Sequence, residues 1–98
     1  MIRIVLPQHL RTLARIDGEA HIEANGARSI STLLDLLEDQ YPVLRGTIRD
    51  HSTKMRRPLV RFFACGEDIS DRSAEWSLPT EIVNGLEPFF IVGAIAGG

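Results

Sequence analysis

Few side chains in this sequence have the types and spacing that catalysis requires. The one cysteine, Cys65, is followed closely by Glu67 and Asp68, and neighbouring carboxylates raise the pKa of a thiol. We therefore expect a half-buried structural cysteine, not a redox thiol or a sulfur relay. The three histidines, His9, His21 and His51, show no metal-ligand spacing, and no Ser-His-Asp or paired-carboxylate arrangement is visible. No metal site is predicted.

The most distinctive chemical feature is the end of the sequence, IVGAIAGG. An apolar run continues from Phe89 directly into Gly97, Gly98 and a carboxylate, whereas most termini end in polar residues. Glycine has no Cβ, so both positions allow extended or positive-φ backbone and close approach by another molecule. Either these residues are a frayed end that contains two glycines by chance, or the terminal carboxylate is the reactive group of the protein.

Composition indicates one ordinary domain over residues 1–98, with the Gly-Gly ending as a flexible tail. The 98 residues are 44% hydrophobic and 24% charged, which suits one modest core and leaves too little chain for a deep active-site cleft. The net charge of −2 gives no reason to expect nucleic acid or an anionic membrane as partner. No signal peptide, membrane span or internal disulfide is visible. We expect a cytoplasmic protein.

Alternating apolar residues predict two strands near the start of the sequence. Residues 2–6 form the first, which Pro7 stops, and residues 19–24 form the second, which Asn25-Gly26 closes. Residues 9–18 between them are expected to form a broad turn. The two strands are predicted to pair as an antiparallel hairpin.

The segment SISTLLDLLEDQYP predicts the main helix. Its apolar residues recur at helical spacing, opposite Asp35, Glu38 and Asp39. Ser29 is the expected N-cap, and Pro42 ends the segment because it cannot donate the next hydrogen bond. The following stretch, RGTIRDHSTKMRRP, carries five basic residues and one acid, a net charge of +4. It is predicted to be a solvated loop, with steering of an acidic enzyme surface or a nucleotide as the alternative.

The last part of the sequence predicts a third strand, LVRFFAC, then a turn into a very short strand, and a final strand over residues 89–95. Residues 71–79 are irregular and contain Trp76, and Asn84-Gly85 marks another turn. The order of strand, strand, helix, strand, short element and strand places the first and last strands at the centre of a mixed sheet. This is the outline of an α+β fold of the β-grasp, or ubiquitin-like, type, with four or five strands packed on one main helix.

The last strand is apolar on both faces, and only one of them can meet the helix. The other is an exposed apolar patch beside the tail if nothing covers it, and we expect such a patch to dock a partner. The predicted docking residues are Phe63, Phe90, Val92 and Ile95. The alternative left open is that residues 71–82 fold over this face, with Trp76 as the cover.

The sequence resembles the ThiS/MoaD family of prokaryotic sulfur carriers. The matching segments are residues 2–6, the helix SISTLLDLLEDQYP, FFACGEDI, Asn84-Gly85 and the ending Ala96-Gly97-Gly98. The long first hairpin and the long loop before LVRFFAC are similar to the MoaD and cysteine-synthesis branches of the family.

The resemblance implies that a partner enzyme adenylates Gly98 with ATP and that sulfur then replaces AMP, leaving a thiocarboxylate. Gly97 and Ala96 would thread the partner's channel, and the carrier itself would hold no cofactor permanently. The implied partners are a ubiquitin-activating-type adenylating enzyme and a sulfur-accepting enzyme, similar to a molybdopterin synthase large subunit or a cysteine synthase. The protein would not be an enzyme alone, although it could serve as the small subunit of a sulfurtransferase.

Two other functions remain open. A ubiquitin-like modifier would be joined to lysines through Gly98. A non-catalytic β-grasp interaction module would have an inert tail, because a fold alone does not fix a function.

Overall fold

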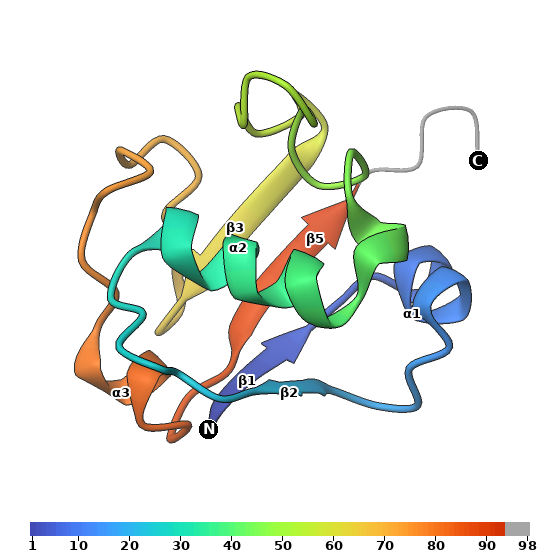
Figure 1. The fold of residues 1–98 in the computed structure, drawn as a ribbon. Helices are drawn as coiled ribbons and strands as arrows, with labels where there is room; N and C mark the ends of the chain where they lie inside the picture. The colour runs from blue at the N-terminus through green and yellow to red at the C-terminus, as the bar shows by residue number, and fades with distance from the viewer. Residues whose placement is uncertain (94–98) are drawn as a thin grey trace.

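The first and last strands pair in parallel at the centre of a five-stranded mixed sheet (Figure 1). The computed structural model describes residues 1–93. Neighbouring strands lie in the order β2-β1-β5-β3-β4, and this confirms the predicted central pair. The bounds of the strands are β1 Ile2–Val5, β2 Ala20–Ile22, β3 Val60–Ala64, β4 Glu67–Asp68 and β5 Phe89–Gly93.

Helix α2, Ile30–Gln40, crosses one face of the sheet (Figure 1) and confirms the predicted main helix. Its buried apolar residues are Ile30, Leu33, Leu34 and Leu37. Ser29 caps the helix by accepting a hydrogen bond from the Thr32 amide, while the Thr32 hydroxyl accepts one from the Ser29 amide. This reciprocal capping box satisfies amides that a helix start otherwise leaves free. A short 3₁₀ helix, η1 Pro42–Leu44, follows.

The predicted turn over residues 9–18 is wrong, because helix α1, Gln8–Ala14, occupies its first half. Only Leu10 is buried in this helix, while Leu13 is 46% exposed. One buried position in seven residues gives no helical period to recognise. The helix starts after Pro7, whose φ suits a helix N-terminus, and ends at Arg15 in the left-handed conformation. A second unpredicted helix, α3 Thr80–Val83, follows Pro79.

Burial alternates along the strands as the sequence predicts. In β5, Phe89 and Ile91 are fully buried under α2, whereas Phe90 and Val92 face away from it. Phe62 in β3 lies next to Phe89, with ring centroids 5.4 Å apart. Strands β1 and β2 pair antiparallel, as predicted, although α1 lies between them in the chain.

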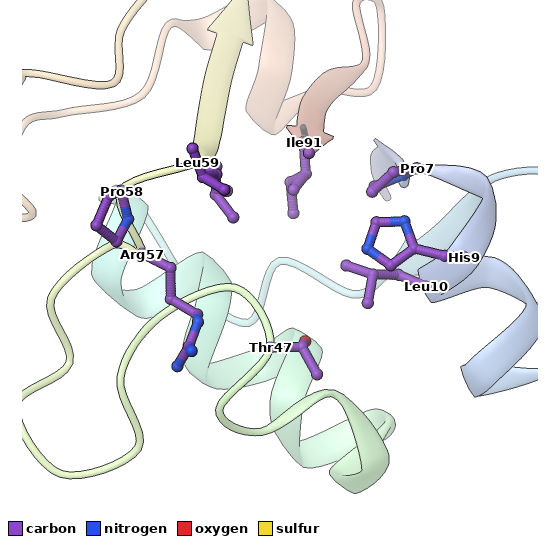
Figure 2. A pocket seen from close by; sticks show the side chains of 10 residues that line it. Pro7, His9, Leu10, Thr47, Arg57, Pro58, Leu59 and Ile91 are labelled. Carbon is purple, nitrogen blue, oxygen red and sulfur yellow. The ribbon is translucent and has the colours of Figure 1, made fainter. Parts of the chain in front are cut away.

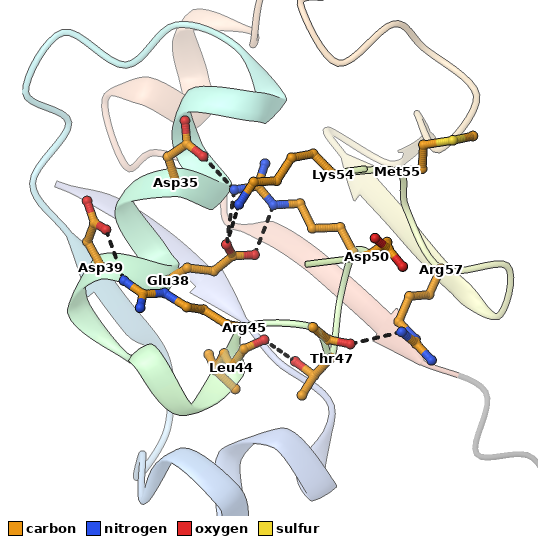
Figure 3. Close-up of polar contacts among 12 residues, drawn as sticks. Asp35, Glu38, Asp39, Leu44, Arg45, Thr47, Asp50, Lys54, Met55 and Arg57 are labelled. Atoms are coloured by element: carbon orange, nitrogen blue, oxygen red, sulfur yellow. Dashed lines mark hydrogen bonds and ion pairs between the residues drawn. The ribbon is translucent and has the colours of Figure 1, made fainter. Parts of the chain in front are cut away.

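Residues 45–58 form a largely exposed loop, as their charge predicts, but Ile48 and Arg49 are buried. Arg49 is only 2% exposed and donates hydrogen bonds from Nε and Nη2 to the carboxylate of Glu38 on α2, at 2.9 and 3.1 Å. Its Nη2 also contacts Asp35. Figure 3 shows Glu38 and Asp35 on the side of α2 that faces this segment. Burial alone would lower the pKa of Arg49, but its bonds to the two carboxylates raise it above the ordinary value. This ion-pair cluster fixes the segment against the helix.

Residues 71–79 run beside the start of α2 and leave the opposite face of the sheet uncovered. Ser77 bridges to Ser29, and the Leu78 amide donates a hydrogen bond to the Arg28 carbonyl at 2.7 Å. Trp76 packs against the core on one side. The Arg72 guanidinium lies over its ring, 5.0 Å from the ring centroid. The alternative in which Trp76 covers the outer face of the sheet is therefore wrong.

Candidate functional site

The face of the sheet opposite α2 carries an apolar patch across three adjacent strands. Phe90 in β5 is paired with Val5 of β1 on one side and with Phe63 of β3 on the other. Phe90 and Val92 remain 39% and 45% exposed. We call Val5, Phe63, Phe90 and Val92 the outer apolar face. The predicted docking residues Phe63, Phe90 and Val92 thus lie together, while Ile95 lies outside the described residues.

Val5 is a member of this face that sequence reasoning missed. It alternates with the buried residues Ile4 and Leu6, so its outward direction was readable from the strand pattern. Its neighbour across the sheet was not readable, because the parallel register of β1 and β5 joins residues 85 positions apart.

Two ion pairs flank the outer apolar face. On the β2 side, Arg3 binds the Glu19 carboxylate through Nε and Nη2, at 2.9 and 2.8 Å, and the hydrogen bond from Arg3 lowers the pKa of Glu19. On the β4 side, Arg61 binds one oxygen of Asp68 at 3.1 and 2.9 Å. These pairs give the patch a charged border, as the polar rim of a docking surface does.

The carboxyl group of Asp68 is held strongly in its ionised form. Hydrogen bonds from the side chain and backbone of Ser70, together with Arg61, lower the pKa of Asp68 to about 2. The Ser70 amide donates to one oxygen at 2.9 Å, while Arg61 occupies the other. The charge on this border therefore persists at any physiological pH.

Strand β5 leads from the outer apolar face to the C-terminal tail, residues 94–98. Its last residue, Gly93, pairs with Val60 of β3 and is the last residue that the structure describes. The predicted reactive residue Gly98 and the predicted threading residues Gly97 and Ala96 lie outside the described residues. The arrangement therefore places the predicted docking surface next to the start of the tail.

Cys65 lies in a turn and is exposed, so the expectation of a half-buried residue is wrong. Its thiol pKa is raised, first by desolvation and then by three nearby glutamates, Glu81, Glu87 and Glu67. A raised pKa leaves little thiolate at neutral pH. Within residues 1–93, no three histidine, cysteine or acidic side chains come together in a way that could hold a metal ion.

Solved structures with the same fold are known, although their sequences differ strongly. The chain matches a chain in the crystal structure of the Amycolatopsis orientalis BexX/CysO complex with a TM-score of 0.76 and 14% identity, over 100% of both chains. It matches SAMP1 from Haloferax volcanii with a TM-score of 0.73 and 14% identity, over 98% of this chain and 97% of that one. The fold is a ubiquitin-like β-grasp.

The β-grasp assignment confirms the predicted α+β class, with a mixed sheet on one main helix. No protein-family model matches the sequence, and no curated protein matches it. In the part of the chain that the structure describes, no helix is long and apolar enough to cross a lipid bilayer.

Proposed function

We propose that the protein is a sulfur carrier whose Gly98 carboxylate is adenylated by a partner enzyme and converted to a thiocarboxylate. The observation that carries this proposal is the outer apolar face, which no other segment of residues 1–93 covers and which is continuous with the strand that leads to the tail. The β-grasp fold and the Gly-Gly ending support it. A carrier needs a docking surface beside a reactive end, and these features support the proposal on both points.

The chemistry belongs to the end of the chain and to the partner. A carboxylate is a poor electrophile, so the partner uses ATP to form an acyl-adenylate at Gly98 and releases pyrophosphate. Hydrosulfide attacks the activated carbonyl and displaces AMP, which gives the thiocarboxylate directly. A persulfide sulfur that displaces AMP gives an acyl disulfide instead, and a second thiol of the sulfur donor then cleaves its S–S bond, forming a disulfide in the donor and releasing the thiocarboxylate. The resulting thiocarboxylate is a strong nucleophile that can transfer its sulfur to an acceptor. No side chain of the carrier takes part in these bond changes.

The ending Ala96-Gly97-Gly98 suits passage through a narrow channel of the partner. Glycine at positions 97 and 98 allows backbone groups of the partner to approach closely. A Cβ at Gly98 would crowd the carbonyl carbon that sulfur attacks. Capture of a terminal carboxylate by backbone amides is also a recurrent mode of recognition.

The proposed partners are an adenylating enzyme and a sulfur-accepting enzyme for molybdopterin or cysteine synthesis. The similarity to a chain from the BexX/CysO complex supports the expectation that a protein of this fold works in a two-protein complex. ATP is consumed by the adenylating enzyme, and the carrier holds no cofactor of its own. We also propose that the protein acts in the cytoplasm.

The docking role is tested by measuring adenylation with the adenylating enzyme encoded in the same genome. Val92→Ser should raise KM in ATP–pyrophosphate exchange about tenfold and change kcat little, because the residue contributes to docking and not to chemistry. Val43→Ser is the matched control, since Val43 is 48% exposed, similar to Val92 at 45%, but lies in η1.

The docking assignment would be wrong if both valine variants behaved like the unchanged protein. Deleting Gly97 and Gly98 should abolish adenylation, whereas an inert interaction module predicts no effect on phenotype or binding. Isopeptide adducts of Gly98 in cell extract would instead indicate a ubiquitin-like modifier.

A further inference from the structure

A hollow of about 310 Å³ opens on the α2 side of the sheet, where β5 ends (Figure 2). Its floor consists of the buried core residues Leu10, Val60 and Ile91. His9 and Pro7 lie on one side, and Leu59 lies on the opposite side. Leu59 is 51% exposed although it is apolar. An open apolar floor of this size fits an aliphatic side chain of another molecule.

The polar groups of this hollow favour an anion. No aspartate or glutamate lines it, whereas Arg57 does. Within residues 1–93, Arg57 forms no direct ion pair, although its charge is one of the causes that lower the pKa of Asp50; its Nη1 donates one hydrogen bond to the Gly46 carbonyl at 3.0 Å. This bond orients the guanidinium, and an arginine has four further N–H donors for a carboxylate. The positive charge of Arg57 at the rim therefore favours binding of an acidic group.

A second hollow differs from this one, because its basic residues form direct ion pairs within the protein. That hollow, of about 460 Å³, lies between α2 and the loops that follow it, and four basic residues line it. Each of these is already close to a carboxylate of the protein: Arg49 and Lys54 to Glu38, Arg56 to Asp71, and Arg72 to Glu67. Their charges are compensated within the protein, so the second hollow offers less attraction to an anion.

The hollow with Arg57 also adjoins the start of the tail. Gly93 lines it, and a Cβ built on Gly93 would lie 3.3 Å from His9 Cε1 and 3.6 Å from Pro7 Cγ. The outer apolar face lies on the other side of the same strand, because Ile91 points inward and Val92 outward. A partner protein that binds the tail would therefore contact both faces of β5.

We infer that this hollow is a second docking subsite, which binds an aliphatic side chain of the partner protein together with a neighbouring carboxylate of the same segment. The aliphatic group packs on Leu10 and Ile91, and the carboxylate binds Arg57. The inference rests on the proposed function only for the identity of the partner. The preference for an aliphatic side chain next to a carboxylate follows from the residues that line the hollow.

The subsite is tested with two short peptides, acetylated and amidated Gly-Leu-Glu-Gly and its neutral match Gly-Leu-Gln-Gly. Each is titrated into the full-length, ¹⁵N-labelled protein. We expect the glutamate peptide to shift the amide signals of Leu59, Val60 and Gly93 and to bind several-fold more tightly than the glutamine peptide. Arg57→Glu should weaken binding of the glutamate peptide at least tenfold, the usual effect of losing a charge-assisted hydrogen bond.

Arg28→Glu is the matched control, because it changes the net charge equally at an exposed position that does not line the hollow. Equal binding of both peptides, equal effects of the two charge reversals, or shifts confined to the outer apolar face would overturn the inference. These outcomes do not depend on ATP or on the adenylating enzyme. Failure of the subsite is thus distinguishable from failure of the sulfur-carrier proposal, which shows as absent adenylation.

Discussion

At the scale of single residues, the structure uses its charged side chains mainly to hold segments in place. Arg49 and Glu38 are 2% and 4% exposed, and a buried charge is tolerated only when a partner compensates it. The sequence showed a basic loop and an acidic helix face separately. Their pairing could not be predicted, because it depends on how residues 45–58 fold back onto α2.

Arg49→Met should lower the free energy of unfolding by about 3–5 kcal/mol, because it leaves the Glu38 carboxylate buried with only Lys54 nearby, at 3.9 Å. The double variant Glu38→Gln, Arg49→Met should recover part of that loss. Urea unfolding of the single and double variants measures the coupling. Arg45→Met is the control, since its pair with Asp39 is exposed and should contribute less than about 1 kcal/mol. Similar losses for Arg45→Met and Arg49→Met would contradict this account.

Asp68 makes the free energy of unfolding depend on pH in the acidic range. Its pKa is about 2 in the folded protein and about 3.9 when unfolded, so the unfolded state takes up the proton first as the pH falls. Its contribution is therefore complete above about pH 4 and is lost as the pH falls through 2. Asp68→Asn should reduce the drop in unfolding free energy between pH 4 and pH 2. An unchanged pH profile in urea unfolding would show that the Ser70 and Arg61 contacts do not stabilise the charge.

At the scale of elements, the sequence period predicted those helices and strands whose buried residues recur regularly, and it missed the helix that has no regular buried side. Helix α2 presents a regular apolar side to the sheet, and β3 and β5 alternate strictly. Helix α1 buries one residue, so its sequence carries almost no period. The outer apolar face was predicted from β5 and Phe63, but the hollow beside Gly93 was not. It depends on three distant segments meeting at the end of β5.

The turn after α3 requires glycine because the backbone of Met1, far away in the sequence, lies against it. Gly85 has a φ of +79°, and a Cβ there would lie 2.3 Å from the Met1 carbonyl oxygen. Gly85→Ala should therefore cost more than the roughly 1–2 kcal/mol of a left-handed conformation alone. Gly66→Ala is the control, because Gly66 has a φ of +78° and open space around its Cβ position. Equal losses of unfolding free energy in the two variants would show that contact with Met1 is relieved at no cost.

At the scale of the whole molecule, the β-grasp fold places the start of the tail on the same strand as an apolar face that stays open among residues 1–93. The central pair of strands and the main helix followed from the sequence pattern, and the comparison with solved structures confirms the fold. The reactivity of the ending is a separate matter, because it depends on the partner that activates it. A measurement on the end of the chain is therefore the most direct test.

That measurement is thiol-selective alkylation, mapped by peptide mass spectrometry, of the protein purified gently from its own host. A parallel sample is incubated with the adenylating enzyme, ATP and a sulfur donor. A Cys65→Ser variant removes the only cysteine, so any remaining alkylation must lie elsewhere. The account predicts alkylation on the C-terminal peptide at Gly98, in both the unchanged protein and the variant. Alkylation of Cys65 alone, with none in the variant after incubation, would contradict the sulfur-carrier function.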